Sequence, residues 1–348
     1  MSNDPVLIKR PMENRKIMSL GRASLVISLP RNWVISNRLK RGDFLSVDVQ
    51  RDGSLVVFPG MRRDHELRKA VMYVEPDDDS DSISRMISTY FLNGYSRLEI
   101  HSRRIFSTEQ ITAIRRASSL LYMSVMESEA EKVTMETLID ESKASLTNSI
   151  QRMHMICLSM CKDTLKSLRE RDLSLARAVI ALDEDVDQFS LLMLRLLRNA
   201  ALDPSLASQL GLEPISLLDY QNVIEAIESV ADNAKKVARY VVNLIEGQQW
   251  VSERLQGLLV STGVEAVEAY NRAVYGFLSR EISDSNAIIR VRRKIEEEDL
   301  RRVRAMILLT EKKNELLICA ICSISDNVRS IAECAAEIAE SALKATLS

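Results

Sequence analysis

The feature that most constrains the fold is a helical periodicity that runs nearly without interruption from Asp140 onward. Apolar residues recur there at intervals of three and four, as in Met153, Ile156 and Met160, which is the spacing of one helix face. Only 10 Gly and 7 Pro interrupt the 348 residues. We therefore expect a long helical region within a multidomain chain, because this length exceeds one simple core.

Breaks in the periodicity divide the helical region into two groups of three helices, which we place at residues 140–247 and 248–348. The two groups are similar to each other, because Glu228–Asn233 corresponds to Cys322–Asn327 and Ala178–Asp183 corresponds to Asn286–Arg290. The expected breaks lie near Arg171–Asp172, Asp203–Pro204, Gly211–Pro214, Gln248 and Ser283.

The first 62 residues are predicted to be rich in short strands. Alternating or fully apolar runs separated by Gly-containing turns indicate two hairpins, with a short helix between them that starts after Pro30. The expected strands are Arg15–Leu20, Leu25–Leu29, Phe44–Gln50 and Ser54–Phe58, and the expected helix is Arg31–Leu39. Asp52–Gly53 is a strong hairpin turn.

Charge is distributed unevenly along the chain. Residues 1–63 hold 12 Lys and Arg against 5 Asp and Glu, whereas the whole chain has a formal net charge of −2. A basic N-terminal segment on an acidic remainder suggests that the segment meets an anionic partner. Chance clustering on a solvated surface is the alternative.

Three segments within residues 13–59, Leu25–Trp33, Leu39–Asp43 and Asp52–Leu55, resemble the AbrB/MazE/SpoVT swapped-hairpin family. The resemblance implies an interleaved homodimer, since one hairpin is too small to bury its own apolar face. It also implies DNA binding by the basic residues of the entry strand and first turn, which are Lys9, Arg10, Arg15, Lys16 and Arg22. The alternative is that this basic surface serves only dimerisation or the docking of a partner.

Residues 63–139 are predicted to form a small α/β region. Lys69–Val74, Arg97–Ile100, Leu121–Glu127 and Lys132–Met135 have strand patterns, and helices are expected to start near Ser82 and Thr108. This region has no phosphate-binding loop, no paired Cys and His residues and no nucleophile motif, so its sequence predicts no function.

The first helical group contains two pairs of acidic residues at i,i+4 spacing, Asp183 with Asp187 and Glu228 with Asp232. This spacing places both members of a pair on one helix face. Here the chain resembles the PhoU family over about 200 residues. The resemblance implies two three-helix repeats, a role in phosphate uptake control and metal binding at the acidic pairs.

The four carboxylates would repel one another unless cations neutralise them. An all-oxygen set favours iron, manganese, magnesium or calcium, and zinc remains possible. In the second group Arg290, Lys294 and Cys322 stand at three of the corresponding positions, and only Asp326 is retained. We therefore expect at most one metal site per chain, in the first repeat, and Arg290 and Lys294 to pair with Glu296–Glu298 or with a partner.

No enzymatic activity is expected, because the three histidines are scattered and no nucleophile constellation stands out. The N-terminus shows no signal peptide, no apolar run is long enough for a membrane helix, and the five cysteines are expected to be reduced core residues of a cytoplasmic protein. The leading hypothesis is a homodimeric DNA-binding regulator of phosphate uptake, of an archaeal type. The alternatives are an adaptor that docks on a phosphate-transporter ATPase or a signalling kinase, and a metal store.

Overall fold

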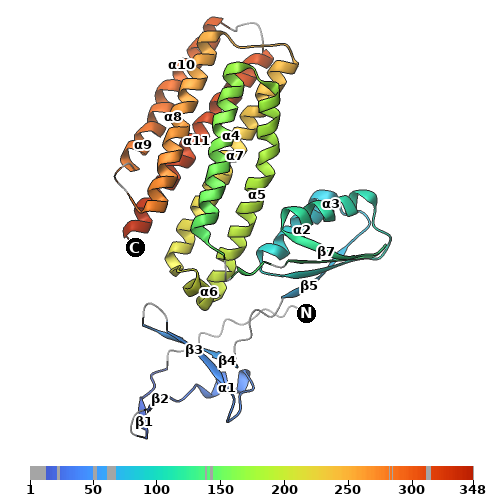
Figure 1. Cartoon of the computed structure of the whole chain (residues 1–348), viewed down its shortest axis with the longest axis vertical. Coiled ribbons are helices and arrows are strands. Elements are labelled where there is room, and N and C mark those ends of the chain that lie inside the picture. The colour runs from blue at the N-terminus through green and yellow to red at the C-terminus, as the bar shows by residue number, and fades with distance from the viewer. Residues whose placement is uncertain are drawn as a thin grey trace. The chain divides into compact units, whose positions relative to one another are not determined.

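The computed structural model describes residues 13–21, 24–49, 53–60, 68–137, 139–141, 144–281, 283, 285–310 and 315–347. The chain divides into two compact units, Met1–Glu66 and Leu67–Ser348. The second unit contains both the α/β region and the long helices (Figure 1).

The N-terminal unit contains two antiparallel hairpins with a short helix between them. β1 (Met18–Leu20) pairs with β2 (Ser24–Val26), and β3 (Leu45–Val49) pairs with β4 (Leu55–Pro59). The helix α1 (Arg31–Ser36) ends earlier than predicted. It ends there because Asn37 and Arg38 leave the helical conformation, Arg38 with a φ of 53°. An exchange of hairpins involves two chains, so this part of the expected fold stays a prediction.

The α/β region is a mixed four-stranded sheet in the order β5-β6-β8-β7, with helices α2 and α3 packed together. β5 and β6 are parallel, and the other neighbours are antiparallel. Alternate residues of the strands, such as Met72, Leu98 and Met135, are buried in the same core as Ile83 of α2 and Ile114 of α3. The bounds are β5 Lys69–Val74, α2 Ser80–Leu92, β6 Arg97–Ser102, α3 Thr108–Leu120, β7 Met123–Ser128 and β8 Lys132–Thr137.

The helices of the first group are separated at the predicted breaks. Asp172 accepts a hydrogen bond from the backbone N–H of Leu175 and starts one long helix, whereas Asp203 and Pro204 end it and start a short one. Pro214 then opens the next long helix. The elements are α4 Leu146–Glu170, α5 Leu173–Leu202, α6 Pro204–Gln209 and α7 Pro214–Glu246.

The second helical group has an interrupted middle helix. Where one helix was predicted, the chain forms α9, a π-helical segment η2 and α10. The second group therefore consists of α8, an interrupted middle helix and α11, rather than three continuous helices. The elements are α8 Glu253–Ser279, α9 Ser285–Lys294, η2 Ile295–Asp299, α10 Leu300–Thr310 and α11 Glu315–Leu347. Among the described residues, no helix is both long enough and apolar enough to cross a membrane.

One continuous core joins the two helical groups. α11 packs against both α7 and α8, and α4 packs against α8 (Figure 1). The approach of α8 to α4 depends on Gly263, because a Cβ atom built there would lie 2.4 Å from Leu165 Cδ2. The bundle is therefore held by small residues at its helix contacts as well as by larger apolar side chains.

The α/β region is attached to the bundle through Arg195 of α5, whose side chain is 2% exposed. The Arg195 guanidinium donates to Glu141 Oε1 at 2.7 Å, to the Phe91 carbonyl at 2.5 Å and to the Tyr95 carbonyl at 2.8 Å. The other carboxylate oxygen of Glu141 accepts from Asn199 Nδ2 at 2.7 Å. A buried charge pair with its hydrogen bonds satisfied thus fixes α5 against the α/β region.

Candidate functional site

The four acidic residues of the first repeat lie on two helices that pack against each other. Asp183 and Asp187 are on α5, and Glu228 and Asp232 are on α7. Asp183 is 5% exposed, and the other three are partly buried. The i,i+4 spacing places both members of each pair on one helix face, and Asp183 of α5 and Asp232 of α7 lie close enough to contact the same lysine side chain.

Burial and neighbouring negative charges shift the pKa values of two members of the cluster, Asp187 and Glu228. Burial, followed by the negative charges of Asp183 and Glu228, raises the pKa of Asp187 to about 7. Burial, followed by Asp232 and Asp183, raises the pKa of Glu228 in the same way. Neighbouring negative charges therefore add to burial in making ionisation of Asp187 and Glu228 less favourable, as expected for like charges in a partly desolvated site.

A lysine supplies positive charge inside this cluster. Lys235 Nζ donates to Asp183 Oδ2, and it also donates to Asp232 Oδ1 at 3.3 Å. Burial lowers the pKa of Lys235, but the hydrogen bond and charge of Asp183, together with Asp232, raise it overall. Lys235 is therefore a charged ammonium that joins the acidic face of α5 to that of α7.

The sequence contains a signal for Lys235 that the analysis of acidic pairs alone misses. Glu228, Asp232 and Lys235 follow one another at intervals of four and three, so all three lie on one face of α7.

Among the described residues, no group of three or more His, Cys, Asp or Glu side chains is arranged to hold a metal ion. The assignment of Asp183, Asp187, Glu228 and Asp232 as metal ligands stays a prediction.

The second repeat also carries a basic residue at the position that matches Lys235. Arg329 stands three residues after Asp326, as Lys235 stands three residues after Asp232. The Arg329 guanidinium pairs with Glu333 at 2.7 Å and lies 4.0 Å from Asp326. Lys294 pairs with Glu265 of α8 at 2.6 Å, an acidic residue outside the predicted set Glu296–Glu298.

The structure describes two of the five residues predicted to contact DNA. Arg15 and Lys16 are both exposed, and Arg15 pairs with Glu13 and donates to Ser28 Oγ at 3.2 Å. Because an exposed ion pair of this kind contributes little stability, Arg15 can exchange the Glu13 carboxylate for another anion. Lys9, Arg10 and Arg22 lie outside the described residues.

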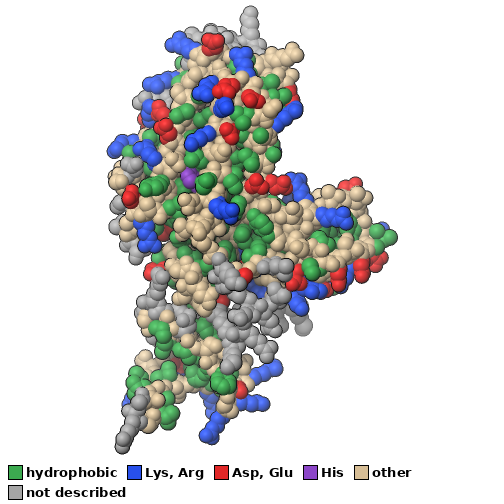
Figure 2. Space-filling view, viewed as in Figure 1, with side chains coloured by type: hydrophobic (Ala, Val, Ile, Leu, Met, Phe, Trp, Pro, Cys, Tyr) green, Lys and Arg blue, Asp and Glu red, His purple; other side chains and the backbone are tan. Residues whose placement is uncertain are grey.

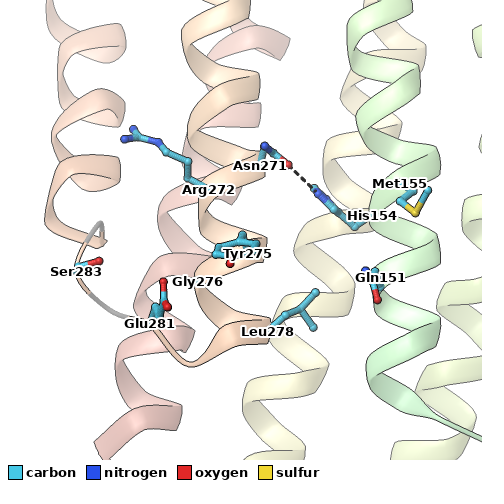
Figure 3. A pocket seen from close by; sticks show the side chains of 10 residues that line it. All are labelled: Gln151, His154, Met155, Asn271, Arg272, Tyr275, Gly276, Leu278, Glu281 and Ser283. Atoms are coloured by element: carbon cyan, nitrogen blue, oxygen red, sulfur yellow. Dashed lines mark hydrogen bonds between the residues drawn. The ribbon is translucent and has the colours of Figure 1, made fainter.

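A cavity of about 260 Å³ lies between α4 and α8 (Figure 3). On its wall, His154 Nε2 lies 3.0 Å from Asn271 Oδ1 and His154 Nδ1 lies 2.9 Å from the Tyr270 hydroxyl. Because Asn271 Oδ1 only accepts, Nε2 donates and Nδ1 accepts from Tyr270. Burial lowers the pKa of His154. His154 is therefore a neutral group whose ring nitrogens both have partners, which is a structural role.

Comparison with known proteins places the four carboxylates in a recognised domain. Residues 150–241, from α4 to α7, match the family model of the PhoU domain. The chain is also similar to the crystal structure of PhoU from Pseudomonas aeruginosa, with 16% identity, a TM-score of 0.42 and coverage of 57% of this chain and 93% of that chain. No curated protein matches the chain. The predicted PhoU resemblance is thus confirmed for the first repeat, whereas the swapped-hairpin resemblance stays a prediction.

Proposed function

We propose that this protein is a regulator of phosphate uptake that binds DNA as a homodimer and has no enzymatic activity. The observation that carries the proposal is the joining of a PhoU domain at residues 150–241 to a basic, strand-built N-terminal unit. The PhoU domain supports the link to phosphate, and the positive charge of the N-terminal unit supports an anionic partner.

Burial in the N-terminal unit supports the homodimer. None of its described residues is buried, and large apolar side chains are exposed on its strands, at Leu25 (74%) and Val49 (68%), and just before β3, at Phe44 (68%). Figure 2 shows hydrophobic side chains on the face of this unit that it draws. Two short hairpins without a core are marginally stable in water at best. A second copy offers the same apolar surface across a two-fold axis, so each copy would complete the core of the other.

The homodimer predicts a specific response to charge on these strands. In Leu25→Glu and Val49→Glu variants, we expect the purified chain to shift from dimer to monomer in sedimentation or light-scattering measurements, because a buried carboxylate at the contact is unfavourable. Ile105→Glu is the matched control, since Ile105 is 72% exposed but belongs to the second unit. A monomeric wild type, or dissociation by all three changes alike, would contradict the proposal.

DNA binding is tested with duplex DNA from the protein's own upstream region against a scrambled duplex, titrated from about 50 mM salt, where phosphate contacts are strongest. We expect the wild type to prefer its own sequence and the double variant Arg15→Glu/Lys16→Glu to bind at least about tenfold more weakly, with a shallower salt dependence. The control is Arg103→Glu/Arg104→Glu, which reverses two adjacent exposed charges in the second unit.

The same titration with and without inorganic phosphate connects the two parts of the proposal. A change in DNA affinity on addition of phosphate would support a helical body that regulates the N-terminal unit. If the folded wild type binds neither duplex at low salt, the DNA-binding proposal fails. The function to test next would then be a PhoU-like adaptor that docks on a transporter ATPase or a kinase.

A further inference from the structure

We infer that Lys235 is the resident cation of the carboxylate cluster and takes the place of a divalent metal ion there. The wild-type cluster therefore holds no divalent ion, and removal of the Lys235 ammonium would open an oxygen-lined cation site. This inference concerns the charge balance of the first repeat and does not depend on DNA binding.

The contacts of Lys235 carry the first step. Its ammonium group donates to Asp183 of α5 and to Asp232 of α7 at once, so it bridges the two helices that supply the acidic pairs. A divalent ion shared by these helices would need oxygen atoms of both, and Asp183 Oδ2 and Asp232 Oδ1 are occupied by Lys235. A metal ion and the ammonium group therefore compete for the same oxygens.

Burial carries the second step. The Asp183 side chain is 7% exposed and that of Lys235 is 20% exposed, so their contact is largely shielded from water. A buried carboxylate needs a charged partner, and separating such a pair is strongly unfavourable. Lys235 thus belongs to the site, unlike the neighbouring Lys236, whose side chain is 50% exposed and lies 3.9 Å from Asp232.

The predicted correspondence between the two helical groups agrees with this assignment. In both repeats the residue three positions after the retained aspartate is basic, Lys235 in one and Arg329 in the other, and both pair with acidic side chains. At the positions predicted to correspond, the second group has Arg290, Lys294 and Cys322 in place of three acidic residues, and a basic residue in place of Lys235. In both bundles a basic side chain of the protein therefore pairs with acidic side chains at this position.

The test is titration of the purified full-length wild type, Lys235→Met and Lys236→Met with Mn²⁺, followed by calorimetry and by the spectrum of the bound ion. We expect no saturable binding at this cluster in the wild type or in Lys236→Met. In Lys235→Met we expect saturable binding that is at least about tenfold tighter than any weak, non-saturating binding by the other two proteins. Thermal denaturation with and without Mn²⁺ is the second measurement, and only Lys235→Met should be stabilised by the ion.

Mn²⁺ binding by the wild type tests the inference even if Lys235→Met does not fold. Saturable Mn²⁺ binding by the wild type that is abolished in Asp183→Asn would show that the carboxylates hold a metal beside Lys235, and would overturn the inference. A folded Lys235→Met protein that binds Mn²⁺ no better than Lys236→Met would overturn it as well.

Discussion

Replacing Arg195 with methionine is expected to lower the free energy of unfolding by about 3–5 kcal/mol, the usual effect of breaking a buried charge pair. The substitution leaves the buried Glu141 carboxylate without its cation and leaves the carbonyl oxygens of Phe91 and Tyr95 without their donor. Burial lowers the pKa of Arg195, and the charge and hydrogen bond of Glu141 oppose this effect. Urea denaturation followed by circular dichroism measures the loss.

The matched control for this change is Arg198→Met. Arg198 lies on the same helix and donates to Asn93 Oδ1 at 2.8 Å across the same contact, but it is exposed. An exposed hydrogen bond of this kind contributes less than about 1 kcal/mol. Equal losses for the two variants would contradict the role assigned to the buried pair, as would unchanged amide exchange in the α/β region of Arg195→Met.

The partners of Arg195 could not be predicted from the sequence. Arg195 stands in an apolar run of α5, and its partners are Phe91, Tyr95, Ser96 and Glu141, which are far away in the sequence. Local periodicity predicts the helix that carries Arg195, but it carries no information on which distant loop the helix meets. The attachment of the α/β region could therefore be found only in the three-dimensional structure.

The elements themselves were largely predictable, because their signals are local. The breaks near Arg171–Asp172 and Asp203–Pro204 are capping residues and a helix-starting proline, and the structure confirms both. The interruption at η2 was missed, since Ile295–Asp299 contains no Gly or Pro to indicate it. A π-helical segment depends on the surrounding packing rather than on a breaking residue.

The four acidic residues of the cluster could be predicted from the sequence, but the cation that neutralises them could not. The i,i+4 pairs identify Asp183, Asp187, Glu228 and Asp232 because a helix face is a local property. Whether a cation from outside or a side chain of the protein neutralises them depends on how α5 and α7 pack. Lys235 lies on the correct face of α7, and only its contact with Asp183 on the other helix gives it that role.

Replacing Asp187 with asparagine is expected to stabilise the protein at pH 8, by about 1–2 kcal/mol after allowance for solvent screening of a partly exposed carboxyl. The folded-state pKa of Asp187 is about 7, above the ordinary value of 3.8. The folded protein therefore binds this proton more tightly than the unfolded chain does, and wild-type stability falls as the pH rises from about 4 to about 7. The asparagine side chain carries no charge at any of these pH values, so the variant should show no such loss.

Denaturation of the wild type and Asp187→Asn at several pH values between these limits measures the difference. The difference in the free energy of unfolding should grow towards pH 7 and level off above it. A difference that stays constant or reverses would contradict the prediction. Because the positive charge of Lys235 lowers the pKa of Asp187, the loss of stability in Lys235→Met should extend to higher pH than in the wild type.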